Sequence, residues 1–309
     1  MNESHHQFRF FASFAVAGAL VGALAGVSSP SSLRFAEERA PGAAYAIIGA
    51  AITAPSPFDE VVLTAGAAEV FDVSTGKTIF EKNADAQLPL ASLTKIMTAV
   101  TALAIAPSYA LVPLNNEQWP LKDLLSFSLA ASSNEGAAAA AAVAGSFVSG
   151  GGDLSDNRNQ FITAMNGESE KFGLTETYFL NETGLDESEG LAGGYGSAHD
   201  VARLISRAYL THPELFDATT KQTSLFTKEN GNKHEADNTN KIVTDIPLLR
   251  ASKTGLTDLA GGNLAIVFDA GVGKPIAIAV LGSTEDERFE DVKTLVAATL
   301  QYLQKDDPK

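Results

Sequence analysis

The chain has 309 residues, of which 45% are hydrophobic, a formal net charge of −15 and no cysteine. This acidic balance argues against a nucleic-acid partner, and the missing cysteines exclude disulfides, a thiol nucleophile and a thiolate metal site. The five histidines form no HxxxH pair, so no zinc site is predicted.

The first 27 residues predict export. An uncharged apolar run of 18 residues, 10–27, follows Arg9, and this is the lower length limit for a helix that spans a bilayer. Ala23-Leu24-Ala25 resembles a signal-peptidase site, so residues 1–27 are expected to be either a cleaved signal peptide or a retained membrane anchor. Both alternatives place the protein outside the cytoplasm, secreted or attached to the cell membrane by this segment.

The rest of the chain predicts a linker, residues 28–57, and one catalytic domain, residues 58–305. Strand patterns flank the turn Val73-Ser74-Thr75-Gly76, and helical periodicity begins near Ser92 and continues, with gaps, to about Leu210. Strand patterns return in residues 223–236, which contain an Asn-Gly turn, and in residues 263–283, which predict a second hairpin. A closing helix is expected over residues 288–303.

Strands from both ends of the chain therefore bracket a helical middle. The simplest assembly is an α/β (α+β) fold in which one antiparallel sheet, built from both ends and flanked by helices, lies beside an all-helical lobe. A cleft between these two parts is the expected place for a site.

The run LPLASLTKIMTAV, residues 88–100, places a lysine inside an apolar helical pattern. Ser92 and Lys95 are three residues apart and share one side of the predicted helix. A serine becomes a nucleophile when a base takes its proton, and lysine is such a base only if burial and a nearby cation lower its pKa by about 3 units. The alternative is an ordinary exposed lysine, which is how we interpret the same spacing in Ser74 and Lys77.

Two further motifs carry polar side chains that could contact a ligand in the predicted cleft. Lys253-Thr254-Gly255 precedes a strand-rich hairpin, where a glycine allows close approach of a ligand and Lys and Thr offer a charge and a hydroxyl to an anion. Ser132-Ser133-Asn134 lies between a Leu-rich helical segment and an Ala-rich one, and its side chains are expected to reach the same cleft.

In this order, Ser-x-x-Lys, Ser-x-Asn and Lys-Thr-Gly resemble the signature of penicillin-binding proteins and serine β-lactamases. The residues around each motif resemble the D-alanyl-D-alanine carboxypeptidases, which are low-molecular-mass penicillin-binding proteins. The similarity covers roughly residues 65–300, and the segments that carry it are 69–99, 165–187, 196–204 and 253–268.

The resemblance implies the DD-peptidase/β-lactamase-like fold and a role for each motif residue. Ser92 would form the acyl-enzyme, Lys95 would be its general base, and Ser132 would relay a proton to the leaving group. The backbone N–H groups of Ser92 and Leu256 would form the oxyanion hole. The residues implied in substrate binding are Asn134, Lys253, Thr254, Gly255 and Leu256.

The implied activity is that of an exported serine carboxypeptidase that removes the terminal D-alanine from peptidoglycan stem peptides ending in D-Ala-D-Ala. Such an enzyme is acylated by β-lactam antibiotics and needs no metal or organic cofactor. The same residues serve a DD-endopeptidase that cuts cross-links, so that alternative stays open. A β-lactamase and a non-catalytic wall-binding homologue are weaker alternatives.

Four features complicate the resemblance. Ser155-Asp156-Asn157 also fits Ser-x-Asn but lies within a Gly-rich stretch, residues 149–157, that predicts a surface insertion. Glu176 precedes Asn181 by five residues, where class A β-lactamases have a spacing of four. His199 is expected to be structural. The interval between the first two motifs is short, so we expect the hairpin that relatives carry there to be trimmed.

Overall fold

The computed structural model of the protein describes residues 55–151, 153–227 and 232–305. These residues belong to one unit, Thr53–Lys309. The predicted export segment 1–27 and nearly all of the predicted linker lie outside the described residues. Among the helices that are described, none is both long enough and apolar enough to cross a membrane.

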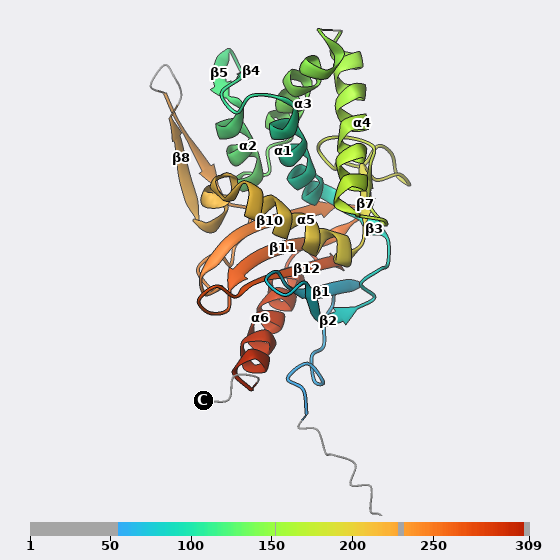
Figure 1. Ribbon diagram of the computed structural model, residues 1–309, viewed down its shortest axis with the longest axis vertical. Coiled ribbons are helices and arrows are strands. Elements are labelled where there is room, and N and C mark those ends of the chain that lie inside the picture. Colours follow the sequence, from blue (N-terminus) through green and yellow to red (C-terminus); the bar gives the residue numbers. More distant parts are fainter. Residues whose placement is uncertain (1–54, 152, 228–231, 306–309) are drawn as a thin grey trace, which may run out of the picture. The chain divides into compact units, whose positions relative to one another are not determined.

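A five-stranded antiparallel sheet forms the centre of the fold (Figure 1), with the strand order β10-β11-β12-β1-β2. The hairpin predicted around residues 73–76 is present as β1 and β2, and the second predicted hairpin is β11 and β12. The first strand pairs with the last along its whole length, from Ala67↔Leu281 to Asp72↔Ile276. The strands are β1 (Ala67–Asp72), β2 (Lys77–Lys82), β10 (Leu249–Thr257), β11 (Gly261–Asp269) and β12 (Pro275–Ser283).

Both faces of this sheet are buried, because helices cover it on either side (Figure 1). Side chains of a strand point alternately to opposite faces, and in β12 Ala277 and Ala279 face the cluster that includes α5 (Ala198–Thr211), whereas Ile276 and Ile278 face α6 (Glu287–Lys305). The near-continuous apolar sequence of β11 and β12 follows from this double burial.

The helical lobe packs closely because its residues are small. In α3, Ala140, Ala141 and Ala144 are fully buried, and a Cβ added to Gly145 would meet the backbone oxygen of Asn157 at 2.1 Å. The Ala-rich segment is therefore a packed helix, as its composition predicts. The lobe contains α1 (Thr94–Ile105), α2 (Leu121–Ala130), α3 (Asn134–Ser149) and α4 (Leu154–Phe172).

A short hairpin is present in the interval between the first two motifs. The strands β4 (Leu111–Leu114) and β5 (Glu117–Pro120) pair antiparallel there. Asn115 and Asn116 join them with φ values of 52° and 61°. Positive φ at both central residues is the geometry of a type I′ turn, which lets two residues close a hairpin and explains how a short interval accommodates it.

The remaining short elements connect the sheet with the lobe. The sheet β3-β7-β6 pairs Leu88 with Gly196 and Tyr178 with Tyr195, so it ties the start of the first motif to two later segments. The predicted Asn-Gly hairpin is present as β8 and β9. The elements are β3 (Leu88–Pro89), β6 (Tyr178–Phe179), β7 (Gly194–Gly196), β8 (Thr223–Thr227), β9 (Lys233–Asp237), and the 3₁₀ helices η1 (Ala91–Leu93) and η2 (Pro213–Thr220).

Candidate active site

Ser92 lies in the 3₁₀ turn η1, two residues before α1 begins. Ala91 has a left-handed φ of 48°, which a non-glycine residue adopts only where its surroundings enforce it. Gly184 packs against this turn so closely that an added Cβ would lie 1.8 Å from the Ala91 carbonyl oxygen. The strained turn is thus held from outside, and it leaves Ser92 half-buried at the helix start, as predicted.

Lys95 is 1% exposed, and its Nζ makes three short contacts. It lies 2.9 Å from Ser92 Oγ, 2.7 Å from Asn134 Oδ1 and 2.7 Å from the carbonyl oxygen of Thr183. The exposed-lysine alternative is therefore excluded. The amide and carbonyl oxygens only accept, so they take two N–H bonds, and in the neutral amine the remaining lone pair faces the hydroxyl of Ser92. This arrangement suits proton transfer from Ser92 to Lys95.

Burial lowers the pKa of Lys95 from 10.5 to about 7, and the nearby negative charge of Glu182 opposes this shift. At neutral pH a large fraction of Lys95 is accordingly the neutral base that the chemistry needs. The second lysine expected nearby is present as Lys253, whose own pKa is lowered in part by the charge of Lys95. Burial itself, however, is the main cause of the shift at Lys95.

Lys253 joins the third motif to the second. It is 1% exposed, and its Nζ donates to Ser132 Oγ at 2.9 Å and to the Thr254 carbonyl at 2.7 Å. Ser132 has a left-handed φ of 55°, which turns its hydroxyl between α2 and α3. Because Lys253 donates to this hydroxyl, the proton of Ser132 is free for another acceptor. Burial and the charges of Lys95 and Arg288 lower the pKa of Lys253, so it gives up a proton more easily.

The edge strand β10 carries the Lys-Thr-Gly motif and the residue that follows it. Thr254 Oγ1 lies 2.5 Å from Thr239 Oγ1. Gly255 comes so near η1 that an added Cβ would lie 2.8 Å from the Leu90 carbonyl oxygen. This close approach brings the backbone of Leu256 beside the Ser92 turn, and the Leu256 side chain is 44% exposed.

All the site residues predicted from the motifs therefore meet where β10 borders the helical lobe. Three of the features that complicated the resemblance, residues 155–157, Glu176 and His199, take no part in the contacts described above. Ser155 and Asp156 are exposed in the first turn of α4, where Asp153 is the N-cap. The backbone N–H of Glu176 donates to Asp200. His199 lies on α5 with its Nδ1 3.2 Å from the buried carboxylate of Glu69.

Sequence reasoning missed four residues that contact or influence the site. Glu182 and Thr183 lie in a segment that supports the family resemblance, but nothing in it indicates that they meet Lys95. Arg288, which donates to the Gly255 carbonyl at 2.7 Å, belongs to an ordinary amphipathic helix pattern. Thr239 lies too far before the third motif for any local pattern to indicate its contact with Thr254. Only the folded chain reveals them.

No group of three or more His, Cys, Asp or Glu residues that could hold a metal ion occurs among the described residues. A cavity of about 400 Å³ adjoins the site beside Asn134 and Thr183. Beside this cavity the contacts described above bring together a serine, a buried amine, a second hydroxyl and a second buried lysine, which are groups that nucleophilic acyl transfer uses.

Comparison with known proteins identifies the class. A model of the D-alanyl-D-alanine carboxypeptidase family (peptidase S11) matches residues 52–108 and 105–285. The chain belongs to this family, and the predicted family is confirmed.

Two curated relatives illustrate the similarity. The D-alanyl-D-alanine carboxypeptidase DacF of Bacillus subtilis is 28% identical over 79% of this chain and 64% of its own length. The D-alanyl-D-alanine endopeptidase of Escherichia coli is 28% identical over 77% of this chain and 76% of its own length. The chain thus spans slightly less than two thirds of the first of these relatives.

Solved structures confirm the predicted fold. Penicillin-binding protein D2 from Listeria monocytogenes, in its ampicillin-bound form, superposes with a TM-score of 0.63 at 29% identity, covering 77% of this chain and 98% of that one. A mutant of the Streptomyces K15 DD-transpeptidase, at 22% identity and a TM-score of 0.69, shows the same fold. The DD-peptidase-like architecture is therefore the right one.

Proposed function

We propose that this chain is a serine-type D-Ala-D-Ala carboxypeptidase that removes the terminal D-alanine of peptidoglycan stem peptides. The observation that carries the proposal is the contact between Lys95 Nζ and Ser92 Oγ in a buried setting that lowers the pKa of the amine to about 7. Family membership supports the same reaction class.

In the proposed acylation, Ser92 Oγ attacks the carbonyl of the penultimate D-alanine while its proton passes to Lys95 Nζ. The carbonyl oxygen becomes negative and accepts from the backbone N–H groups of Ser92 and Leu256. The peptide C–N bond then breaks as the proton taken up by Lys95 is relayed through the Ser132 hydroxyl to the leaving amine, which leaves Lys95 neutral again for the hydrolysis step. Lys253 donates to the Ser132 hydroxyl and holds it in place for this relay. Water then cleaves the ester by the reverse transfers, which releases the shortened peptide.

The substrate's terminal carboxylate is assigned to the β10 edge. Lys253 and Thr254 offer a cation and a hydroxyl there. Asn134 is assigned to the substrate backbone, because its side-chain oxygen already accepts from Lys95 and its NH₂ group is left to donate. Gly255 contributes by letting β10 approach the Ser92 turn closely.

The proposed partners and location follow from the same assignment. β-Lactam antibiotics are expected to acylate Ser92, in keeping with the ampicillin-bound relative. No cofactor is assigned a role. The protein is proposed to act on the cell wall outside the cytoplasm, with residues 1–27 as signal peptide or anchor.

The test is covalent labelling. Incubation with a fluorescent penicillin, followed by peptide mapping, is expected to give one label per chain on Ser92, and Ser92→Ala is expected to lose it. Ser74→Ala is the matched control, because Ser74 has the same spacing to a lysine but lies in an exposed turn. Persistent labelling of the Ser92→Ala variant would contradict the assignment.

A DD-endopeptidase is the second candidate, and the similarity to the Escherichia coli endopeptidase favours keeping it. The two activities use the same residues and differ in the leaving group. Release of D-alanine from a soluble acyl-D-Ala-D-Ala peptide, measured beside cleavage of cross-linked dimers, separates them.

A further inference from the structure

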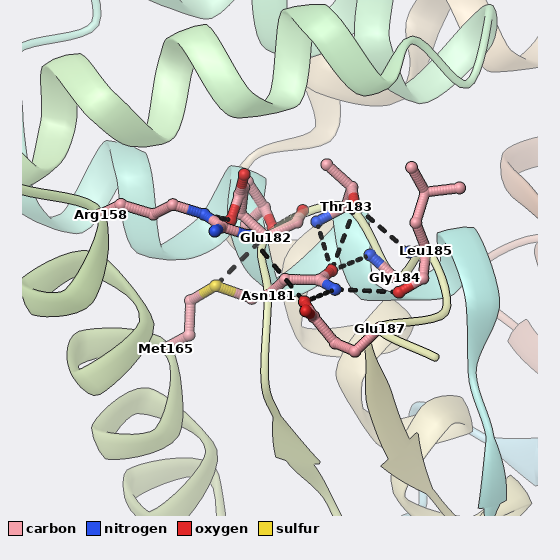
Figure 2. Close-up of polar contacts among 9 residues, drawn as sticks. Arg158, Met165, Asn181, Glu182, Thr183, Gly184, Leu185 and Glu187 are labelled. Atoms are coloured by element: carbon pink, nitrogen blue, oxygen red, sulfur yellow. Dashed lines mark hydrogen bonds and ion pairs between the residues drawn. The ribbon is translucent and has the colours of Figure 1, made fainter. Parts of the chain in front are cut away.

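The segment 181–187 folds around the side chain of Asn181 (Figure 2). Asn181 Oδ1 accepts from the backbone N–H groups of Thr183 and Gly184, at 3.1 and 2.6 Å. Its Nδ2 donates to the Leu185 carbonyl and to Glu187 Oε1, at 2.9 and 2.6 Å. One amide side chain thus fixes the direction of the Thr183 carbonyl, which accepts from Lys95.

Two helices hold this segment from opposite sides. On the α1 side, Thr98 Oγ1 donates to the Glu182 carbonyl at 2.7 Å, next to the contact with Lys95. On the α4 side, Arg158 Nε donates to Glu182 Oε2 at 2.9 Å, and its Nη2 lies 4.0 Å from Glu187 Oε1. Figure 2 shows Arg158 reaching from α4 across to both carboxylates.

The position of Glu182 creates an electrostatic difficulty. Its side chain is 4% exposed, and its negative charge acts on Lys95 in the direction that keeps the ammonium protonated. A protonated Lys95 cannot take the proton of Ser92. Arg158, whose side chain is 48% exposed, supplies the opposite charge directly on the Glu182 carboxylate.

The charged groups near Lys95 come from several elements. Lys253 approaches from β10, and Glu135 lies beside Asn134 at the start of α3. Glu135 lines the cavity beside Asn134 together with Arg158, Glu182, Asp186 and Glu187. Among these groups the ion pair of Arg158 with Glu182 has one partner that solvent can reach and one that it cannot. The pair therefore transmits a change at the protein surface to the buried amine.

We propose that Arg158 is a positioning residue for the acylation step: by neutralising Glu182 it keeps Lys95 available as a neutral base. This inference rests on the function proposed above. Arg158 touches neither Ser92 nor Lys95 in the contacts described and acts through Glu182. Nothing in the motif pattern points to it, since it lies on α4, outside the three motifs.

The experiment measures the second-order rate of Ser92 acylation by a fluorescent penicillin between pH 5 and 9. In the wild type the rate rises with pH as the neutral fraction of Lys95 grows. We call this rising part of the pH–rate profile the acid limb. Arg158→Met leaves an unbalanced carboxylate beside the amine, so the acid limb is expected to move up by about one pH unit. Glu182→Gln is expected to move the acid limb to lower pH, because the negative charge that stabilises the protonated form of Lys95 is lost.

Two more variants separate charge from shape. Arg158→Lys keeps the positive charge and is expected to restore the position of the limb. The double variant Arg158→Met/Glu182→Gln carries neither charge and is expected to return close to the wild-type limb. Lys171→Met is the matched control on α4. It also removes a positive charge from an ion pair, since Lys171 Nζ lies 2.7 Å from Glu168 Oε1, but this pair lies outside the segment 181–187 and its contacts.

The outcomes are distinct. Limb positions that move in opposite directions in the two single variants and recover in the double variant support the inference. A uniform loss of rate with an unmoved limb overturns it, because Arg158 then only holds the segment in place. If one variant does not fold, the remaining variants still decide. Absence of Ser92 labelling in the wild type would instead refute the proposed function.

Discussion

Replacing Lys95 by methionine is expected to abolish acylation and yet stabilise the folded protein at pH 6. The physical reason is the cost of keeping a buried amine protonated. The folded-state pKa is about 7, whereas an unfolded lysine has the ordinary value of 10.5. The folded state therefore binds fewer protons than the unfolded state between these two values, and stability is lost as the pH falls from 10.5 to 7.

The magnitude follows from the shift. At ~1.4 kcal/mol for each pKa unit, the change from 10.5 to about 7 corresponds to about 5 kcal/mol of stability lost below pH 7. Lys95 is 1% exposed, so solvent screens little of this. Methionine removes that cost but leaves Asn134 Oδ1 and the Thr183 carbonyl without a donor, at roughly 1–2 kcal/mol each.

The net gain for Lys95→Met is thus about 1–3 kcal/mol at pH 6. At pH 9 the cost of the lysine has fallen to about 2 kcal/mol, and the variant is expected to be equal to the wild type or less stable. The stability difference is therefore expected to vanish or change sign with pH. Lys253 contributes in the same direction in both proteins.

Urea unfolding followed by circular dichroism at pH 6 and pH 9 measures this difference. Lys77→Met, which removes an exposed lysine at the start of β2, is the control for the loss of one positive charge. A stability difference between wild type and Lys95→Met that stays constant across this range would refute the reasoning, because Lys95 would then be protonated alike in both states.

Two further predictions concern the β10 edge. Thr239→Val is expected to raise KM for an acyl-D-Ala-D-Ala peptide about five-fold with little change in kcat, because Thr254 loses the hydroxyl that orients it. Thr239→Ser retains that contact and is the control. An unchanged KM in Thr239→Val would exclude this role of Thr239. Gly255→Ala is expected to slow acylation about 100-fold, since the added Cβ would displace β10 from the Ser92 turn and with it one oxyanion donor. Gly167→Ala, whose Cβ would meet nothing within 4 Å, is the glycine control and is expected to label at the wild-type rate.

Much of the fold and part of the site follow from local sequence. Alternating apolar residues around Val73–Gly76 predict β1 and β2, and the apolar stretch of 263–283 predicts β11 and β12. The spacing of Ser92 and Lys95 places them on one side of a helix. These predictions hold because neighbours in sequence are held by the geometry of a single element. The turn of the short hairpin at Leu111–Pro120 depends on two adjacent left-handed asparagines, which the length of the interval did not suggest.

The order of the motifs, together with the family resemblance, was enough to group Ser132 with Lys253, which are 121 positions apart. Tertiary structure alone decided how the Lys95 amine becomes a base. Burial, the Thr183 carbonyl 88 positions away, and the Glu182 charge balanced by Arg158 all come from elements that meet only when the lobe packs. A periodic pattern states which face of an element is buried, and the packing of the whole chain determines which polar groups are buried with it.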